Sequence, residues 1–518
     1  MSPQAQPYPR RWQALIVLAL SLVIVTLDNT ILNVALPTIR EDLDASSSEL
    51  QWIVDSYLLV FAGLLLAAGT LGDRFGRRRA LFTGLGVFGL GSFLAATSGS
   101  STELIASRAL MGVGAAAIMP TTLSILTNVF PKEERPKAIA IWAAASGIGI
   151  AIGPITGGWL IEHFDWSSVF LVNLPIVAGC LVAGAVLIPE SRDAESPRLD
   201  LAGIGLSIVG LTAVVWALIE APERGWTSTP IVAAFATGAV ILAAFVAWER
   251  HTPQPMLDVS VFRNMRFTAA NVSITFVFFA LMGVMYFLTT YLQSVMGYSA
   301  LQAGLRMAPI AAGLILAAKL SVILTARFGT KAVVAGGLLL VGISLGAFTA
   351  VEVTTPYFSK VAGALTFMGV GMGLAMAPAT EAIMGSLPKA KAGIGSAMND
   401  VVREVGGTLG VAVLGSIVSS GYASGMDGAT SKLPHEAAEA AGDSVGGAHE
   451  VAGEVGGSAG AKLIALADQS FVEAMTTAAG LAAGVALAGA LIAAAFLPSR
   501  ARAEASSSRA EAPEAAAA

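Results

Sequence analysis

The chain has 518 residues, of which 13% are charged and 55% are apolar, with a formal net charge of −5 and a mean hydropathy of +0.73. Soluble domains carry about 25% charged residues, so this composition excludes an ordinary soluble protein and a disordered chain, and the thinly spread basic residues disfavour a nucleic-acid partner. One cysteine, Cys180, and four scattered histidines provide neither a disulfide nor a metal-binding pattern.

Apolar runs long enough to cross a membrane, about 20 residues each, recur along the whole chain. Fourteen such runs lie near 12–39, 51–71, 80–98, 102–127, 138–161, 168–188, 200–220, 229–248, 268–291, 299–324, 331–350, 357–380, 396–420 and 472–497. The first run is too long for a secretory signal and lacks an Ala-x-Ala cleavage site, so we expect it to remain as a helix. The sequence therefore predicts an all-α membrane protein with fourteen transmembrane helices.

The positions of lysine and arginine predict the orientation of these helices. With the N-terminus inside, 21 of the 30 basic residues fall in inside segments, 5 fall outside and 4 lie within predicted helices. This asymmetry predicts a multi-pass protein of the plasma membrane with both termini in the cytoplasm.

A short internal repeat predicts how the helices are grouped. The run Asp73-Arg74-Phe75-Gly76-Arg77-Arg78 follows the second helix, and Ala326-Arg327-Phe328-Gly329-Thr330-Lys331 follows the tenth. Paired repeats around a central site are typical of secondary transporters. We therefore expect a cytoplasmic N-terminus (1–11), a six-helix bundle (12–188), two inserted helices (200–248) and a second six-helix bundle (268–497).

Two stretches do not fit a membrane span. Residues 421–471 are rich in glycine, alanine and acidic residues, and we expect an extracellular segment that forms either a flexible loop or a short helical hairpin. Residues 498–518 are mostly alanine, serine and glutamate, a composition that predicts a disordered cytoplasmic tail.

Two charged residues lie inside predicted helices of the first half. Asp28 follows Trp12 by 16 residues, which is about 24 Å along a helix, and Arg108 lies in the fourth helix. Because a charge in the hydrocarbon region is costly, each should face a cavity or a partner, and burial favours the protonated form of a carboxyl group. The alternatives are a polar packing contact between Asp28 and Asn29 or Asn33, and a purely structural clamp made by Arg108.

Two glycine-containing runs have a further, regular pattern. The turn after the second helix combines glycines that allow close helix packing with an acid and several arginines: Gly69, Asp73, Arg74, Gly76, Arg77 and Arg78. The fifth helix contains a run that predicts a bent, closely packed helix: Gly147, Gly153, Pro154, Gly157 and Gly158.

The run Leu27-Asp28-Asn29-Thr30-Ile31-Leu32-Asn33-Val34-Ala35-Leu36-Pro37, Arg108 in the fourth helix and the two glycine-containing runs form four motifs. Together they resemble the signature motifs of the major facilitator superfamily, and more narrowly those of its fourteen-helix drug:proton antiporters. The resemblance extends over all the predicted helices and includes two further stretches, Trp52–Tyr57 and Gly395–Gly407. The second turn departs from the pattern, with Ala326 where an acid like Asp73 is expected, so the two halves are not equivalent.

The resemblance implies a role for each motif. Asp28 corresponds to the acid of the first-helix motif and Arg108 to the basic residue linked to proton transfer. Asp73 and the following arginines correspond to the motif that controls opening and closing. The antiporter motif, whose glycine packing seals a proton leak, corresponds to Gly153, Pro154, Gly157 and Gly158. Asp55 and Glu381 are further proton-coupling candidates. For Asp400, Arg403 and Glu404 we favour a local ion-paired cluster with a structural role.

Two stripes of side chains in the second half suggest a substrate cavity. Flexible thioethers and aromatic rings suit varied apolar ligands, although such stripes also occur in ordinary packing. The stripes comprise Phe279, Met282 and Tyr286 in the ninth helix and Met368, Met372 and Met376 in the twelfth.

The sequence thus predicts a monomeric, proton-driven exporter of amphipathic drugs or antibiotics that needs no cofactor and is not an enzyme, since no nucleophile–base pair, phosphate loop or metal cluster is present. The alternatives are a dedicated exporter of one antibiotic or metabolite, an exporter of a lipid or siderophore, and a membrane sensor that transports nothing.

Overall fold

The computed structural model describes residues 8–192, 200–252, 255, 257–388, 391–431 and 433–499. These residues are helical, without strands, and include thirteen helices that are long and apolar enough to cross a membrane. The predicted all-α membrane architecture is therefore confirmed. Apart from Pro498 and Ser499, the predicted disordered tail lies outside the described residues.

The first half of the chain forms seven helices, because the predicted sixth span is divided at Val172 into a short and a longer piece. The helices are α1 (Arg11–Leu43), α2 (Ser47–Phe75), α3 (Arg77–Ala96), α4 (Ser101–Val129), α5 (Arg135–His163), α6 (Ser168–Leu171) and α7 (Asn173–Leu187). The α2 helix begins with a capping box in which Ser46 and Glu49 each satisfy the other's backbone N–H.

The start of α1 is fixed to the turn before α5 by Arg11. Its guanidinium donates two hydrogen bonds to the carboxylate of Glu134, at 2.7 and 2.9 Å. These contacts hold the pKa of Glu134 below its ordinary value. The ion pair joins the first helix to the fifth at this end of the bundle.

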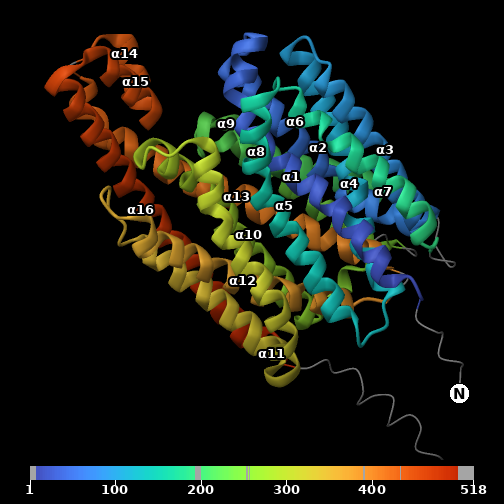
Figure 1. The fold of residues 1–518 in the computed structure, drawn as a ribbon. Helices are drawn as coiled ribbons and strands as arrows, with labels where there is room; N and C mark the ends of the chain where they lie inside the picture. Colours follow the sequence, from blue (N-terminus) through green and yellow to red (C-terminus); the bar gives the residue numbers. More distant parts are fainter. Residues whose placement is uncertain are drawn as a thin grey trace, which may run out of the picture.

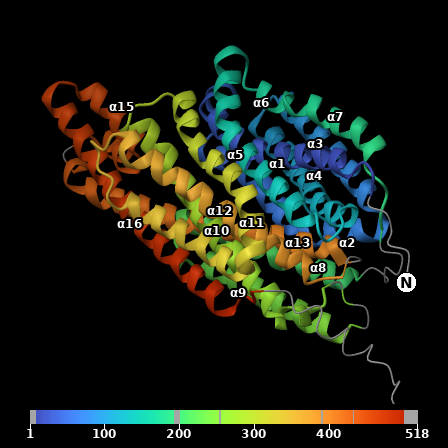
Figure 2. The same ribbon diagram turned by 60° about the horizontal axis from the view of Figure 1, so that its bottom comes forward.

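Two helices, α8 (Leu201–Arg224) and α9 (Thr229–His251), follow the first half. They form a hairpin on the outside of the molecule, where α8 packs against α2 and α13 (Figures 1 and 2). Trp248 of α9 donates a hydrogen bond to Asp200 at the start of α8, at 2.9 Å, which closes the hairpin at that end.

The second half of the chain forms the remaining elements. They are η1 (Val259–Arg263), α10 (Met265–Thr290), η2 (Tyr291–Val295), α11 (Ala300–Phe348), η3 (Tyr357–Val361), α12 (Ala362–Gly385), α13 (Ala392–Thr430), α14 (His435–Asp443), α15 (Val445–Val455) and α16 (Gly457–Phe496). The long α11 is interrupted at Gly329, whose φ of 82° and ψ of 162° are not helical. This break falls between the two spans predicted at 299–324 and 331–350.

Residues 421–471, which sequence left as either a loop or a hairpin, are mostly helical. The α13 helix extends through Thr430, and α16 begins at Gly457, 15 residues before the predicted span. Between them α14 and α15 form a short hairpin at one end of the molecule (Figure 1). Its contacts include a hydrogen bond from the Tyr422 hydroxyl to the carbonyl of Ala441, at 2.8 Å.

The described side chains form two hydrophobic cores, one centred on α1 to α7 and the other on α10 to α16. Helices from the two halves lie side by side in both views (Figures 1 and 2). The α5 helix packs along α11, and α13 packs against α2 and α4. Contacts between the halves therefore run through α5, α11 and α13.

Candidate functional site

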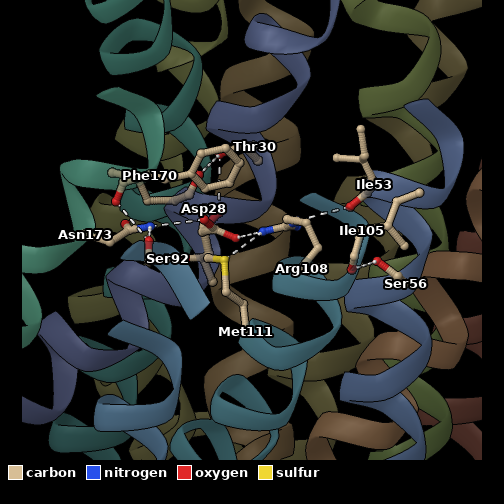
Figure 3. Close-up of polar contacts among 12 residues, drawn as sticks. Asp28, Thr30, Ile53, Ser56, Ser92, Ile105, Arg108, Met111, Phe170 and Asn173 are labelled. Carbon is tan, nitrogen blue, oxygen red and sulfur yellow. Dashed lines mark hydrogen bonds and ion pairs between the residues drawn. The ribbon is translucent and has the colours of Figure 1, made fainter. Parts of the chain in front are cut away.

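Asp28 and Arg108, placed in separate predicted helices, form a buried ion pair. Asp28 of α1 and Arg108 of α4 are 0% and 1% exposed, and Arg108 Nη1 contacts Asp28 Oδ2 (Figure 3). The two opposite charges attract each other strongly because no solvent separates them. Their attraction offsets part of the free-energy cost of placing each charge inside the membrane. Each residue has the partner that the sequence argument required.

The guanidinium of Arg108 is also held from the side opposite Asp28. Its Nε donates to the carbonyl oxygen of Ile53 on α2, at 3.1 Å, and its Cζ lies 4.4 Å from the centre of the Tyr57 ring. A carbonyl dipole and the face of an aromatic ring both favour a cation. These contacts keep the arginine in place independently of the charge on Asp28.

A second set of polar residues holds the other carboxylate oxygen of Asp28. Asn173 of α7 donates from Nδ2 to Asp28 Oδ1, at 3.1 Å, and the same nitrogen lies 3.0 Å from Ser92 Oγ of α3. Ser92 in turn donates to the carbonyl of Phe170, at 2.9 Å (Figure 3). We call Asp28, Arg108, Asn173 and Ser92 the Asp28 cluster. Sequence reasoning missed Asn173 and Ser92, whose only signal is that each is polar within an apolar run.

The Asp73 carboxylate connects the turn after α2 to the other half of the molecule. Asp73 Oδ1 lies 2.7 Å from Nε of Arg77, and both residues are buried. The backbone N–H of Gly393, in the first turn of α13, donates to Asp73 Oδ2 at 2.8 Å. A carboxylate at a helix N-terminus meets unpaired N–H groups and the positive end of the helix dipole.

Glycines allow the close approach that this contact requires. A Cβ on Gly69 would lie 2.6 Å from the carbonyl oxygen of Gly393, and one on Gly393 would lie 2.5 Å from that of Gly69. Gly76, at the end of the turn, has a φ of 116°, which a glycine adopts readily.

The arginines after Asp73 make different contacts. Arg74 lies over the ring of Phe75, at 5.6 Å from its centre, and Arg78 donates through Nη1 to the carbonyl of Ile188 just after α7, at 3.2 Å. Arg78 also donates its backbone N–H to Glu190 at 3.1 Å. The turn is thus bonded both to its own half and, through Asp73, to α13.

The glycine run of α5 contacts two different helices. A Cβ on Gly153 would lie 1.9 Å from Thr30 Oγ1, and one on Gly157 would lie 3.0 Å from Ile31, so these two glycines pack against α1 beside the Asp28 cluster. Gly147 and Gly158 instead face Leu314 and Leu301 of α11. The helix therefore contacts both α1, which carries Asp28, and the second half.

Pro154 of the same run also lies at the boundary between the halves. Its ring approaches Gly304 of α11, where an added Cβ would lie 3.1 Å away. The predicted bent and closely packed helix thus places its proline against the other half.

The two remaining proton-coupling candidates lie elsewhere. Asp55 of α2 is partly buried on the side of α8, where its electrostatic neighbours are Glu220 and Glu223. Glu381 of α12 accepts a hydrogen bond from Arg266 of α10 at 3.1 Å, with a quarter of its side chain exposed. Neither residue is placed in the Asp28 cluster.

A further buried acid–arginine pair lies on α13. Arg403 approaches Asp400 at 3.5 Å, but it also donates from Nη2 to Ser146 Oγ of α5 at 2.9 Å. Its guanidinium lies 4.6 Å from the centre of the Phe278 ring. The expected local ion pair is present, and it also joins α13 to the first half of the chain.

A small cavity of about 30 Å³ lies beside this pair. It lies among α5, α10, α11 and α12 and is lined mainly by apolar and sulfur-containing side chains. Its lining comprises Ser146, Gly147, Phe278, Leu281, Met285, Met307, Ile310, Ala311, Leu314, Met372 and Met376.

Of the predicted lining, Met372 and Met376 border this cavity, and Met368 is buried nearby in α12. The α10 stripe does not line it. The side chains of Met282 and Tyr286 pack against Gly407 and Gly415 of α13, and the backbone of Phe279 approaches Gly410. The α10 residues that border this cavity are Phe278, Leu281 and Met285, on a neighbouring face of the same apolar helix.

The helices and the site together define a multi-pass α-helical membrane protein whose two halves meet beside a buried acid–arginine pair. A family model described as Major Facilitator Superfamily matches residues 18–411. The chain belongs to the major facilitator superfamily, and the resemblance drawn from its motifs is confirmed.

The chain is similar to several curated proteins with related names. It is 38% identical over 484 residues to the multidrug efflux pump LfrA of Mycolicibacterium smegmatis, covering 93% of this chain and 95% of that protein. It is 34% identical to the tetracenomycin C resistance and export protein of Streptomyces glaucescens, covering 79% and 76%. It is 33% identical to the methyl viologen resistance protein SmvA of Salmonella typhimurium, covering 80% and 84%.

Solved structures share the fold at low sequence identity. The human organic anion transporter MFSD10 superposes with a TM-score of 0.61 at 14% identity, covering 94% of this chain and all of that one. The proton:xylose symporter XylE gives a TM-score of 0.61 at 15% identity, covering 94% and 96%. At these identities the likeness concerns the fold alone.

Proposed function

We propose that this protein is a proton-coupled antiporter that exports amphipathic, drug-like compounds across the plasma membrane. The observation that carries this proposal is the buried Asp28 cluster, an acid–arginine pair placed inside the membrane region and enclosed by polar partners. The names of the relatives, which include multidrug efflux and antibiotic resistance proteins, support the same function.

The proposed topology has fourteen membrane crossings with both termini in the cytoplasm. Thirteen spans are long and apolar enough to cross, and the longest of them, Leu301–Phe348, is broken at Gly329. The two parts of α11 have 29 and 19 residues on either side of that glycine, about one membrane thickness each. Counting them separately makes the number of crossings even, as the distribution of lysine and arginine requires.

The Asp28 cluster is suited to take up and release a proton. When Asp28 is charged, Arg108 neutralises it. When Asp28 binds a proton, the ion pair is lost, and Arg108 keeps its contacts with the Ile53 carbonyl, the Tyr57 ring and the Met111 sulfur. The two protonation states therefore hold α1 and α4 together with different strength. A proton moving inward gains about 2.3 kcal/mol per 100 mV of membrane potential, which supplies a driving force.

The packing of α5 connects this change to the rest of the molecule. Gly153 and Gly157 contact α1 within one turn of Asp28, whereas Gly147 and Gly158 contact α11. A shift of α1 on protonation is therefore passed directly to the boundary between the halves. At the cytoplasmic end, the hydrogen bond from Gly393 to Asp73 holds the halves together and must break when the protein opens inward.

The substrate is proposed to bind in an enlarged form of the cavity that Met372 and Met376 line. Flexible thioethers adapt to ligands of different shape, and opening of the halves enlarges a site that holds about 30 Å³ in this structure. A second candidate function, export of one antibiotic, is favoured by the similarity to the tetracenomycin C resistance and export protein.

Efflux from inverted membrane vesicles that contain the protein tests the proposal. A panel of apolar cations, neutral antibiotics and anionic compounds is measured with the pH gradient intact and after an ionophore has collapsed it. The proposal expects gradient-dependent accumulation of several chemically unrelated compounds. Accumulation of a single antibiotic favours the second candidate function, export of one antibiotic. Accumulation that is unchanged when the pH gradient is collapsed contradicts proton coupling.

A further inference from the structure

Arg306 is a charged residue of the membrane region for which the proposed transport cycle has no use. It lies in the second turn of α11, partly exposed, with its guanidinium 3.5 Å from the centre of the Tyr298 ring and 5.6 Å from that of Tyr357. Two aromatic faces favour a cation but do not neutralise it. The two rings fix the guanidinium at one edge of the helix.

The hydrogen-bonding capacity of Arg306 is largely unused. Nη1 donates to the carbonyl of Gln302 at 3.2 Å, while the buried Nε has no hydrogen-bond partner in the part of the chain that is described. None of the ion pairs among the described residues includes Arg306. A guanidinium keeps its charge under all physiological conditions, so the partly exposed Arg306 side chain can pair with an anion from outside the described chain.

An open groove of about 580 Å³ begins at Arg306. It runs between α11 and the start of α12, and its walls are formed by Leu305, Pro309, Ala312 and Phe358. Leu305 is 52% exposed and Phe358 is 84% exposed. The groove therefore combines one cationic end with an apolar floor, in a volume typical of a small-molecule site, about 300–1,000 Å³.

The position of the groove matches the level of lipid headgroups. In the proposed orientation α11 begins at the outer surface, and Arg306 lies six residues from Ala300, about 9 Å along the helix. Long arginine side chains at this depth extend toward the interface.

We propose that this groove binds one anionic phospholipid of the outer leaflet. The phosphate accepts hydrogen bonds from the Arg306 guanidinium, whose planar fork fits two phosphate oxygens, and an acyl chain lies on the apolar floor beside Phe358. Positive charge at one end selects an anionic headgroup, and the sideways opening admits a ligand from the bilayer. The choice of leaflet rests on the proposed topology; the site itself does not depend on transport.

Native mass spectrometry of the full-length protein in detergent tests the headgroup. Phosphatidylglycerol, phosphatidylcholine with the same acyl chains, and inorganic phosphate are titrated separately. We expect one molecule of phosphatidylglycerol to bind about tenfold more tightly than phosphatidylcholine, the size expected for charge-assisted hydrogen bonds. Arg306→Gln should remove this preference, whereas Lys319→Gln, which removes an exposed cation from the same helix, should retain it.

A second variant tests the groove without changing the charge. Ala312 is exposed on the groove wall, so Ala312→Trp should fill the groove, leave the fold intact and lower phosphatidylglycerol binding by a similar factor. Equal binding of both lipids to the wild-type protein overturns the proposal, as does saturation by inorganic phosphate alone or unchanged binding to Arg306→Gln. Asp28→Asn should bind the lipid normally, which separates failure of this site from failure of the transport proposal.

Discussion

The turn between α2 and α3 and the turn within α11 occupy equivalent places in the two halves and share one backbone design. Gly76 in the first turn has a φ of 116°, and Gly329 in the second has a φ of 82°. Both values lie in the region that glycine adopts without strain. The repeated Arg-Phe-Gly sequence therefore corresponds to a repeated backbone conformation.

The similarity extends to a tertiary hydrogen bond. In the first turn the N–H of Arg77 donates to the carbonyl of Ser191, just after α7, at 2.9 Å. In the second the N–H of Thr330 donates to the carbonyl of Ser499, just after α16, at 3.1 Å. Each turn is thus bonded to the segment that follows the last helix of its own half.

The two turns differ in their side chains. Asp73 of the first turn crosses to the other half and accepts the hydrogen bond of Gly393. Its counterpart, Ala326, is exposed and has no polar group. The comparison shows that the repeat retains the backbone design while only the first turn carries the carboxylate that joins the halves.

Among substitutions in the two turns, we expect Asp73→Ala to have the largest effect on transport and on the contact between the halves. The substitution leaves Arg77, which is 2% exposed, without its carboxylate, and breaking one side of a buried pair costs about 3–5 kcal/mol. It also removes the acceptor for Gly393. We expect vesicle transport to fall by about tenfold or more, and the ends of α2 and α13 to move apart.

The separation is measured by distances between spin labels placed at Phe75, which is exposed, and at Lys391. Asp73→Asn serves as the matched control, because its amide oxygen can still accept from Gly393, and it should have a smaller effect. Unchanged distances and transport in Asp73→Ala would refute the role given to this turn.

An intermediate effect is expected from Gly329→Ala. A Cβ there would lie 2.4 Å from the carbonyl oxygen of Ser499, and a positive φ costs a non-glycine residue about 1–3 kcal/mol. The thermal unfolding temperature should fall, while the dependence of transport on the pH gradient should remain. A loss of coupling without loss of stability would show that the second turn also has a gating role.

The smallest effect is expected from Ala326→Asp, which restores the acid that the second turn lacks. Because Ala326 is exposed, the new carboxylate should change the free energy of unfolding by no more than about 0.5 kcal/mol and leave the transport rate unchanged. Equilibrium unfolding and vesicle efflux measure both quantities. A clear gain in transport would mean that the second turn can also join the halves.

Much of the fold follows from the sequence because long apolar runs, loop charges and glycine turns are local signals. They placed the helices to within a few residues in most cases. The gap between the spans predicted at 299–324 and 331–350 coincides with the break in α11 at Gly329. The length of α13 and α16 beyond the predicted spans was missed, since their alanine- and glycine-rich ends are not apolar enough to suggest membrane helices.

The candidate site was only partly predictable. Asp28 and Arg108 stand out because charge is rare in these helices, whereas the partner Asn173 is contributed by tertiary packing that no local pattern records. The same limit explains the α10 stripe: Phe279 and its neighbour Phe278 are equally apolar, and only the arrangement of α13 decides which one borders the cavity.

The central claim is that Asp28 carries the proton that drives export. Purified protein in liposomes containing a pH-sensitive dye measures it directly, by the proton movement that follows addition of a transported compound. We expect wild-type protein to exchange protons for substrate and Asp28→Asn, which keeps the side-chain size, to fold and bind substrate without moving protons. The control is Asp44→Asn, at the exposed end of α1 with a φ of 49° that asparagine tolerates, and it should behave as the wild type. Substrate-driven proton movement at the wild-type rate in Asp28→Asn would contradict the account.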